Sequence, residues 1–331
     1  MKRFRNILLV AGLEDGPVPE HLFDRALTLA RRNAAKLTLI DVVPKLELIS
    51  EVFPHEMLEL TLRGRRESLL RLAESAQKQG LEVETALAAG TPFLEITRRV
   101  QQFRHDLVIT GGGRGEDAGR VMDSTTMHLL RKCPCAIWVA RPTDSDGYKR
   151  ILAAVDPDPT DAERDSLNGT IMELAVSLAK LEASELHVVH AWEQYGLPVG
   201  SSAEVWVQWQ ETACAEVKRR LCEFLSEYPP GSDSQVHLVG GKPAHSISRL
   251  AREEQIDLLV MGTVCRTGIR GFLIGNTAEG VLLRVDCSLL TVKPEGFVSP
   301  IQPVGDSNRL SELSLTRRHL ETLQEHPSQR K

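Results

Sequence analysis

Residues 261–279 carry the residue types of an anion-binding loop, because an apolar strand end leads through glycines into a helical pattern. Glycines let a backbone approach a phosphate closely, and the free N–H groups at a helix start favour an anion. Arg266 can add a charged contact, while Asn276 and Thr277 can cap the helix or hydrogen-bond a phosphate oxygen. The candidate ligand-binding residues of this segment are Gly262, Thr263, Cys265, Arg266, Gly275, Asn276 and Thr277.

The spacing in this loop does not match the best-known phosphate motifs. A Walker A loop needs Gly-Lys-Ser/Thr, and a dinucleotide fingerprint needs GxGxxG. Glycine-rich loops alone are weak evidence, since α/β proteins need tight turns anyway. The elements around the loop must therefore support the assignment.

The chain contains its own pattern twice. Residues 5–10 and 149–155 are a basic residue followed by an apolar strand, and residues 90–92 and 241–243 are equivalent Gly-x-Pro turns. Where the copies agree, packing of the shared scaffold explains the agreement. Where they differ, we expect that one copy has kept a site that the other has lost.

We expect two domains, over residues 1–142 and 148–294, and then a flexible polar tail over residues 295–331. Each copy alternates strand and helix patterns, which predicts βαβ crossovers and a parallel sheet with helices on both faces. The strands are expected near residues 7–11, 37–43, 82–88, 107–110, 136–140, 150–155, 185–191, 234–240, 256–261 and 288–292. The helices are expected near residues 20–33, 56–79, 124–132, 160–181, 203–226, 244–254 and 277–285, with one more from Pro92.

Together these features resemble a tandem universal stress protein of the proteobacterial two-domain type. The resemblance covers about residues 3–294, and residues 261–279 and 128–135 are its most specific parts. It implies two doubly wound α/β domains of the HUP (adenine nucleotide alpha hydrolase-like) fold. Each would have a five-stranded parallel sheet with helices on both faces, and such domains commonly pair along the last strand.

The resemblance also implies a nucleotide site in the second copy. ATP-binding members carry a G-x2-G-x9-G-(S/T) loop and an acidic residue at the end of the first strand. Asp156, Gly262 and Gly275 match this pattern, whereas Cys265 replaces a glycine and Asn276 replaces Ser or Thr. A Cβ at a left-handed position costs roughly 1–2 kcal/mol. The implied cofactor is ATP or another adenine nucleotide, with Mg²⁺ only alongside it.

The first copy departs further from the family pattern. Gly12 stands where the second copy has Asp156, and Asp123 stands where it has Gly275. A carboxylate at Asp123 can cap the following helix and would repel a phosphate there. We therefore expect the first domain to bind no nucleotide.

Three functions remain open. The leading one is a cytoplasmic stress-response protein that binds a nucleotide-like small molecule without turning it over. The second is a binder of an apolar or amphipathic metabolite beside Trp192, Trp206 and Trp209, with a vestigial phosphate loop. The third is a slow ATPase, for which Asp156 and Asp158 are the evident carboxylates. Asp156 also lies in an Asp-Pro-Asp-Pro turn, so a turn role competes with ligand contact.

Charge and composition limit the classes of partner that we expect. The net charge of −5 argues against nucleic-acid binding, and no apolar stretch is long enough to span a bilayer. Residues 1–7 lack the pattern of a secretory signal. We expect a small-molecule ligand, an internal pairing of the two copies, and either a monomer or a homodimer.

Cysteines and histidines offer weaker candidates. Six cysteines in a chain this long do not indicate a disulfide framework. Cys133-Pro134-Cys135 is either a metal or redox pair or a set of structural thiols. His187 and His190 should point to opposite faces of one strand, which makes them a poor metal pair.

Overall fold

The computed structural model divides the chain into two compact units. The N-terminal unit comprises Lys2–Gly111 and Ile301–Lys331, and the C-terminal unit comprises Gly112–Pro300 together with Met1. The residues that the structure describes are 4–12, 18–43, 55–111, 122–142, 147–193, 202–263 and 275–303. The expected tail lies outside the described residues beyond position 303.

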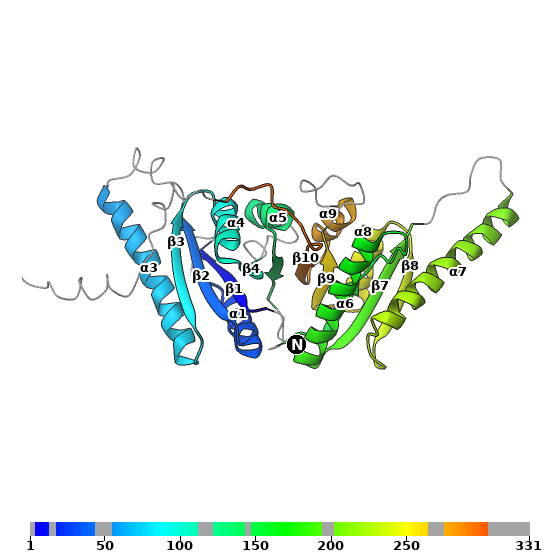
Figure 1. Cartoon of the computed structure of the whole chain (residues 1–331), viewed down its shortest axis with the longest axis horizontal. Coiled ribbons are helices and arrows are strands. Elements are labelled where there is room, and N and C mark those ends of the chain that lie inside the picture. Colours follow the sequence, from blue (N-terminus) through cyan, green and yellow to red (C-terminus); the bar gives the residue numbers. More distant parts are fainter. Residues whose placement is uncertain are drawn as a thin grey trace, which may run out of the picture. The chain divides into compact units, whose positions relative to one another are not determined.

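The N-terminal unit is a parallel sheet covered by helices (Figure 1). Its strands lie in the order β3-β2-β1-β4. Helix α1 packs against β1, β2 and β4, and α3 packs along β2 and β3. The elements are β1 (Asn6–Gly12), α1 (Glu20–Asn33), β2 (Lys36–Val43), α3 (His55–Lys78), β3 (Val83–Ala89), α4 (Pro92–Phe103) and β4 (Leu107–Gly111).

The C-terminal unit contains the whole second repeat and the end of the first. Its five parallel strands lie in the order β10-β9-β6-β7-β8, and β5 adds to them antiparallel to β10. Its first elements are α5 (Ser124–Lys132), β5 (Ala136–Ala140), β6 (Arg150–Ala154), α6 (Ala162–Glu182), β7 (Glu185–Trp192) and α7 (Ala203–Glu227). The others are β8 (Gln235–Gly240), α8 (Pro243–Glu253), β9 (Leu258–Gly262), α9 (Asn276–Leu282) and β10 (Ser288–Val292).

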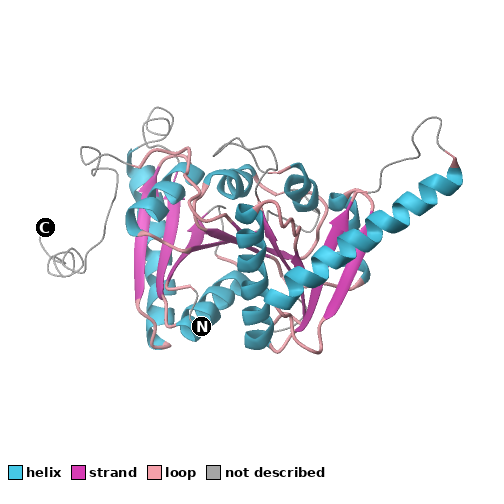
Figure 2. Ribbon diagram, turned by 45° about the vertical axis from the view of Figure 1, so that its right-hand side comes forward, coloured by secondary structure: helices cyan, strands magenta, loops and turns pink. Residues whose placement is uncertain are grey.

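The strand order explains why helices cover both faces of this sheet (Figure 2). Successive strands run one way from β6 to β8 and then return through β9 and β10. Since parallel crossovers are right-handed, the reversal places α6 and α7 on one face and α8 and α9 on the other. The sequence prediction of two doubly wound α/β repeats is therefore confirmed.

Matching residues perform the same scaffold task in both repeats. The Asp106 carboxylate accepts backbone N–H bonds from Arg5 (2.7 Å) and Asn6 (3.1 Å) at the start of β1. Asp257 does the same for Lys149 (2.7 Å) and Arg150 (2.9 Å) at the start of β6. Each carboxylate satisfies donors that would otherwise be left over where a strand begins.

Hydrophobic patterning placed the elements well, and most bounds agree with the sequence expectation within two residues. Pro92 and Pro243 each stand in the first turn of a helix, where a missing N–H costs nothing. None of the helices in the described part of the chain is both long enough and apolar enough to cross a membrane.

Candidate functional site

The strand order reverses beside β6, and this switch point is where an open α/β sheet binds ligands. Strands β6 and β9 are parallel neighbours, with Ala154 in register with Met261. Their carboxyl ends therefore meet at one edge of the sheet. Asp156 is the second residue after β6 and Gly262 ends β9, so the fold brings these two predicted site residues to the same edge.

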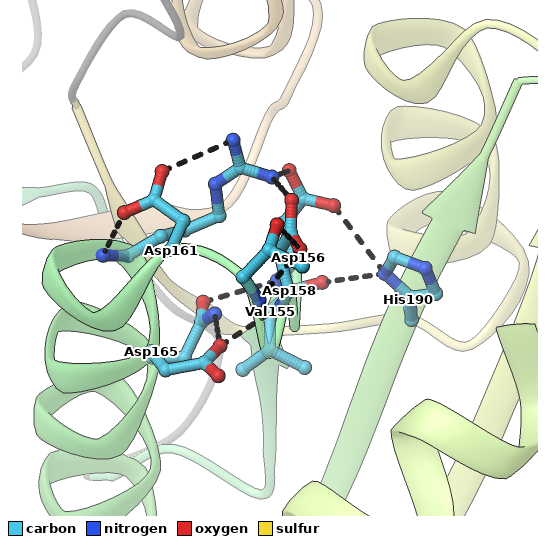
Figure 3. A network of polar contacts seen from close by, with 9 residues as sticks. Val155, Asp156, Asp158, Asp161, Asp165 and His190 are labelled. Carbon is cyan, nitrogen blue, oxygen red and sulfur yellow. Dashed lines mark hydrogen bonds and ion pairs between the residues drawn. The ribbon is translucent and has the colours of Figure 1, made fainter.

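The first residues after β6 form an acidic cluster around one arginine (Figure 3). The Arg164 guanidinium lies 3.0 Å from a carboxylate oxygen of Asp158, 3.3 Å from one of Asp161 and 3.8 Å from one of Asp156. Asp161 also caps α6 by accepting the Arg164 N–H (3.1 Å). Three carboxylates facing one cation leave this edge with excess negative charge.

Asp156 is also held by its neighbours on α6 and β7. Its backbone N–H donates to Asn168 Oδ1 (3.0 Å), which fixes the strand end against α6. His190 Nδ1 lies 3.0 Å from the Val155 carbonyl and 3.8 Å from Asp156 Oδ1. Because a carbonyl only accepts, Nδ1 carries the proton. The Asp156 side chain is 38% exposed, so it is held in place yet reachable.

A cavity of about 530 Å³ opens beside Asp156, between the ends of β6 and β7 and helix α7. Its apolar wall consists of Trp192, Trp209, Ala213, Val217 and Leu221. Its polar wall includes Asp156, Asp158, Arg164, His190, Glu216 and Arg220. The lining is divided about evenly between apolar and ionisable side chains, so the cavity suits a small molecule that has both an aromatic ring and polar groups.

The two arginines of the cavity already have carboxylate partners. Arg164 faces the acidic cluster, and Arg220 Nε donates to Glu216 Oε1 (2.8 Å). Hydrogen bonds from Arg219 and Arg220 lower the pKa of Glu216 to about 2. Hydrogen bonds from Thr160, with a smaller contribution from the two cavity arginines, lower the pKa of Asp158. The acids therefore stay ionised at neutral pH, and the cavity favours a ligand that offers hydrogen-bond donors.

Gly262 lies close to helix α6. A Cβ at this position would lie 2.7 Å from Leu167 Cδ2 on α6, closer than carbon atoms tolerate. The glycine thus lets α6 pass close to the end of β9. This role holds whether or not a ligand binds, so ligand contact by Gly262 stays a prediction.

Thr263 begins the predicted anion loop and is only 1% exposed. Its N–H donates to the Val292 carbonyl (3.3 Å), and its own carbonyl accepts the Gly275 N–H (3.2 Å). Its hydroxyl accepts a hydrogen bond from Lys293 Nζ (2.6 Å). Thr263 therefore ties the two ends of the loop to the sheet.

The helix after the loop starts as predicted but without a side-chain cap. Gly275 is the N-cap of α9, and no side chain of that residue is available to accept the first N–H groups. Asn276 and Thr277 lie in the first turn and do not take the capping position expected as one of their two roles. Cys265 and Arg266 lie outside the described residues.

In the first repeat, the space corresponding to Asp156 is already filled. Gly12 ends β1, and a Cβ built there would lie 1.7 Å from Asp41 Oδ1 of the neighbouring β2. Asp41 is paired with Arg65 Nη1 of α3 at 3.0 Å. Burial raises the pKa of Asp41 above its usual range, although Arg65 opposes this shift.

The other end of the first-repeat site also differs. The Asp123 carboxylate accepts the Thr126 N–H (2.9 Å) and the Thr126 hydroxyl (2.5 Å), so it caps α5. The prediction that Asp123 caps its own helix is confirmed. A carboxylate at this point occupies one of the N–H groups that an anion would use and repels the anion.

The weaker candidates do not assemble a metal site. His187 Nδ1 lies 3.0 Å from His237 Nε2 on β8, whereas His190 contacts the end of β6. These two histidines do not converge, as the sequence indicated. Within the described ranges, no group of three His, Cys, Asp or Glu side chains is arranged to hold a metal ion.

Two cations of this region were missed from the sequence. Arg164 lies three residues after Asp161 on α6, and a lone arginine after three nearby aspartates was a usable signal. Lys293 follows β10, in the place where Arg141 follows β5 in the first repeat. A basic residue before a proline recurs in both copies, at 141–142 and 293–294, and was the available signal for it.

Comparisons with known proteins agree with this architecture. A model of the universal stress protein family matches residues 3–141 and 147–293. The chain is 28% identical to universal stress protein E of Escherichia coli (strain K12) over 217 residues, 64% of this chain and 68% of that protein. It is 24% identical to the universal stress protein E homolog of Haemophilus influenzae, over 88% and 98%.

Solved structures give the same result. The crystal structure of PA1789 from Pseudomonas aeruginosa PAO1, described as functionally unknown, matches with a TM-score of 0.71 and 27% identity. The match covers 88% of this chain and 94% of that one. A universal stress protein from Archaeoglobus fulgidus shares the fold, with a TM-score of 0.60 and 17% identity over 89% and 98% of the two chains.

Proposed function

Because this chain belongs to the universal stress protein family, we propose that it binds a nucleotide-like small molecule at the strand ends of its second repeat. The observation that carries this proposal is the cavity beside Asp156, at the switch point of the sheet. It combines aromatic surface with a partly exposed carboxylate, which suits a heterocyclic base that carries N–H donors.

The charges orient such a ligand. The acidic cluster around Asp156 disfavours a phosphate and accepts hydrogen bonds from a base or a sugar. The uncapped first turn of α9 offers N–H groups to an anion instead. We therefore place the base in the cavity and the phosphates toward Thr263 and the start of α9. Mg²⁺ would accompany the nucleotide and has no separate site in this proposal.

Binding rather than turnover is the proposed activity. Asp156 and Asp158 are both engaged by Arg164, so neither is placed as a general base for water. Occupancy would stabilise the folded state of the second repeat and favour one of its conformations. A phosphate-release assay that showed turnover in the wild type, and none in Asp156→Ala, would contradict this part.

The apolar wall of the cavity supports a second candidate ligand. Trp209 lines the cavity and remains 46% exposed, so its ring is accessible to a ligand. An amphipathic metabolite could occupy this wall and make no use of the loop. The alternative predicts a ligand that depends on Trp209 but not on Gly275.

Equilibrium dialysis with ATP, AMP and sulfate tests both candidates. For a nucleotide, we expect Asp156→Ala, Trp209→Ala and Gly275→Asp each to raise Kd at least about tenfold. Asp41→Asn is the matched control, because it alters the corresponding carboxylate of the first repeat and should leave Kd unchanged. Absence of binding at millimolar nucleotide would overturn the nucleotide proposal. A copurified apolar mass in native mass spectrometry, lost in Trp209→Ala only, would establish the alternative.

A further inference from the structure

Two thiols and a buried ammonium group lie together at the end of α5. Cys133 is the C-cap of α5, and its Sγ lies 3.6 Å from the Sγ of Cys135. Lys293 Nζ donates to the carbonyl of Leu130 in the last turn of the same helix (2.5 Å). The proposed ligand site uses none of these three side chains.

The environment of Lys293 is suited to holding a thiolate. Its ammonium group donates to the Leu130 carbonyl and the Thr263 hydroxyl and lies 4.8 Å from the centre of the Phe297 ring. Burial lowers the pKa of Lys293 to about 8, and negative charge on Cys133 or Cys135 opposes that shift. The ammonium and an ionised thiol therefore stabilise each other.

We propose that Cys133 and Cys135 are a redox pair that a peroxide converts into a disulfide, with Lys293 stabilising the attacking thiolate. Cys135 is half-buried, whereas Cys133 is fully buried. Cys135 is therefore the thiol that a peroxide reaches first. Cys133, already in contact with it, is the resolving thiol.

The chemistry balances with peroxide as the oxidant. The Cys135 thiolate attacks one peroxide oxygen and breaks the O–O bond, giving a sulfenic acid and a hydroxide that takes up a proton to become water. The Cys133 sulfur then attacks Cys135 Sγ, and the sulfenic oxygen leaves as a second water with the Cys133 proton. Two thiols are oxidised by two electrons, and one peroxide is reduced to two waters.

The second repeat supplies a built-in control. Cys287 stands just before β10 as Cys135 stands just before β5, but Val285 replaces the second thiol. Cys287 is half-buried, as Cys135 is. Desolvation of its thiol, together with the negative charges of Asp286 and Asp257, raises the pKa of Cys287 to about 12, against an opposing effect of Arg141. Cys287 should remain a protonated, unreactive thiol.

Oxidation would also reach the ligand loop. Forming the disulfide brings the two sulfurs from 3.6 Å to about 2.05 Å apart. This shift would move the end of α5, where the Leu130 carbonyl accepts a hydrogen bond from Lys293. Lys293 in turn bonds Thr263 at the start of the loop. A change in nucleotide affinity on oxidation is the one consequence that rests on the proposed function.

The test uses the full chain with Ser at the cysteines 214, 222, 265 and 287, which keeps only Cys133 and Cys135. After brief exposure to hydrogen peroxide, the tryptic peptide that begins at Cys133 should lose two hydrogens and regain them with dithiothreitol. With Cys133→Ser added, the same peptide should instead carry a sulfenic acid that dimedone traps. A peptide that keeps both thiols under these conditions would overturn the pair, whatever the nucleotide result.

The role of Lys293 is tested by the rate of the reaction. Lys293→Met should slow oxidation at least about tenfold, the effect of raising the thiol pKa by one unit. Lys293→Arg keeps the charge and should stay close to the parent rate, which separates the charge from any folding defect. A variant that keeps Cys287 as its only cysteine should react with peroxide more slowly than both Lys293 variants. An unchanged rate in a folded Lys293→Met protein, or equal reactivity at Cys287, would contradict the proposal.

Discussion

In each repeat, a carboxylate lies at the ends of the first two strands. The two repeats differ in which of these strands supplies it. In the second repeat, Asp156 follows β6 and approaches His190 of β7. In the first repeat, Gly12 ends β1, and Asp41 of β2 occupies the space beside it. Asp41 and His190 stand at the same position of their strands, six residues into each. The carboxylate therefore comes from the second strand in the first repeat and from the residues after the first strand in the second repeat.

In the first repeat, a neighbouring side chain therefore fills the position that corresponds to Asp156. Asp41 is only 7% exposed and is tied to Arg65, whereas Asp156 is 38% exposed and lines a cavity. The helices above these edges differ as well, since α3 packs along β2 and β3 while α7 leaves a cavity beside β6 and β7. The prediction that the first repeat binds no nucleotide thus has a physical reason, the side chain that occupies this position.

The largest expected effect comes from forcing the second-repeat residue into the first repeat. Gly12→Asp would place a Cβ 1.7 Å from Asp41 Oδ1 and add a second carboxylate beside it. Overpacking and an uncompensated charge should together lower the free energy of unfolding by about 4 kcal/mol. Urea unfolding followed by circular dichroism measures this change.

A double substitution sharpens the same comparison. Gly12→Asp with Asp41→His recreates the second-repeat pair and should recover about 2 kcal/mol relative to Gly12→Asp. Gly64→Ala on α3 is the control, because a Cβ there meets no atom within 4 Å. If Gly12→Asp were as stable as the wild type, the interpretation of a filled site would be wrong.

The sequence showed that the first repeat lacks an acidic residue at Gly12, but not that Asp41 occupies the space beside it. The strand and helix limits followed from hydrophobic periodicity, and comparing the copies pointed to Asp156 and Asp123 without a structure. The contact between Gly12 and Asp41 depends on the register of β1 against β2, which no local pattern specifies. Likewise, Lys293 reaches Leu130 and Thr263 only because β5 and β10 pair.

A second contrast lies where each repeat enters its fourth strand. Arg104 and Gln255 both adopt left-handed backbone, and the buried residues that follow are His105 and Ile256. Burial, with a smaller effect of Arg99, lowers the pKa of His105 to about 4 from an ordinary value of 6.5. Between pH 4 and pH 6.5, His105 is therefore protonated in the unfolded chain but neutral in the folded chain.

The first repeat should therefore be sensitive to acid through His105. Stability from this group is complete above pH 6.5 and falls as the pH drops toward 4, by about 3 kcal/mol in total. His105→Ile copies the second repeat and should remove this slope from the unfolding free energy. Urea unfolding from pH 7 to pH 4.5 measures both proteins, and parallel pH curves for the two would contradict the assignment.

The smallest expected effect concerns the two helix starts after the fourth strands. Asp123 caps α5, whereas Gly275 leaves the first turn of α9 without a side-chain acceptor. Asp123→Ala should cost about 1 kcal/mol, and Gly275→Asp should gain a few tenths, about 0.3 kcal/mol. Unfolding measured with and without ATP separates capping from binding. A capping carboxylate accepts N–H groups that a phosphate would otherwise use and adds a negative charge beside it, so Gly275→Asp should be more stable alone and gain less from the nucleotide. Equal stabilisation of both proteins by ATP would place the phosphates elsewhere.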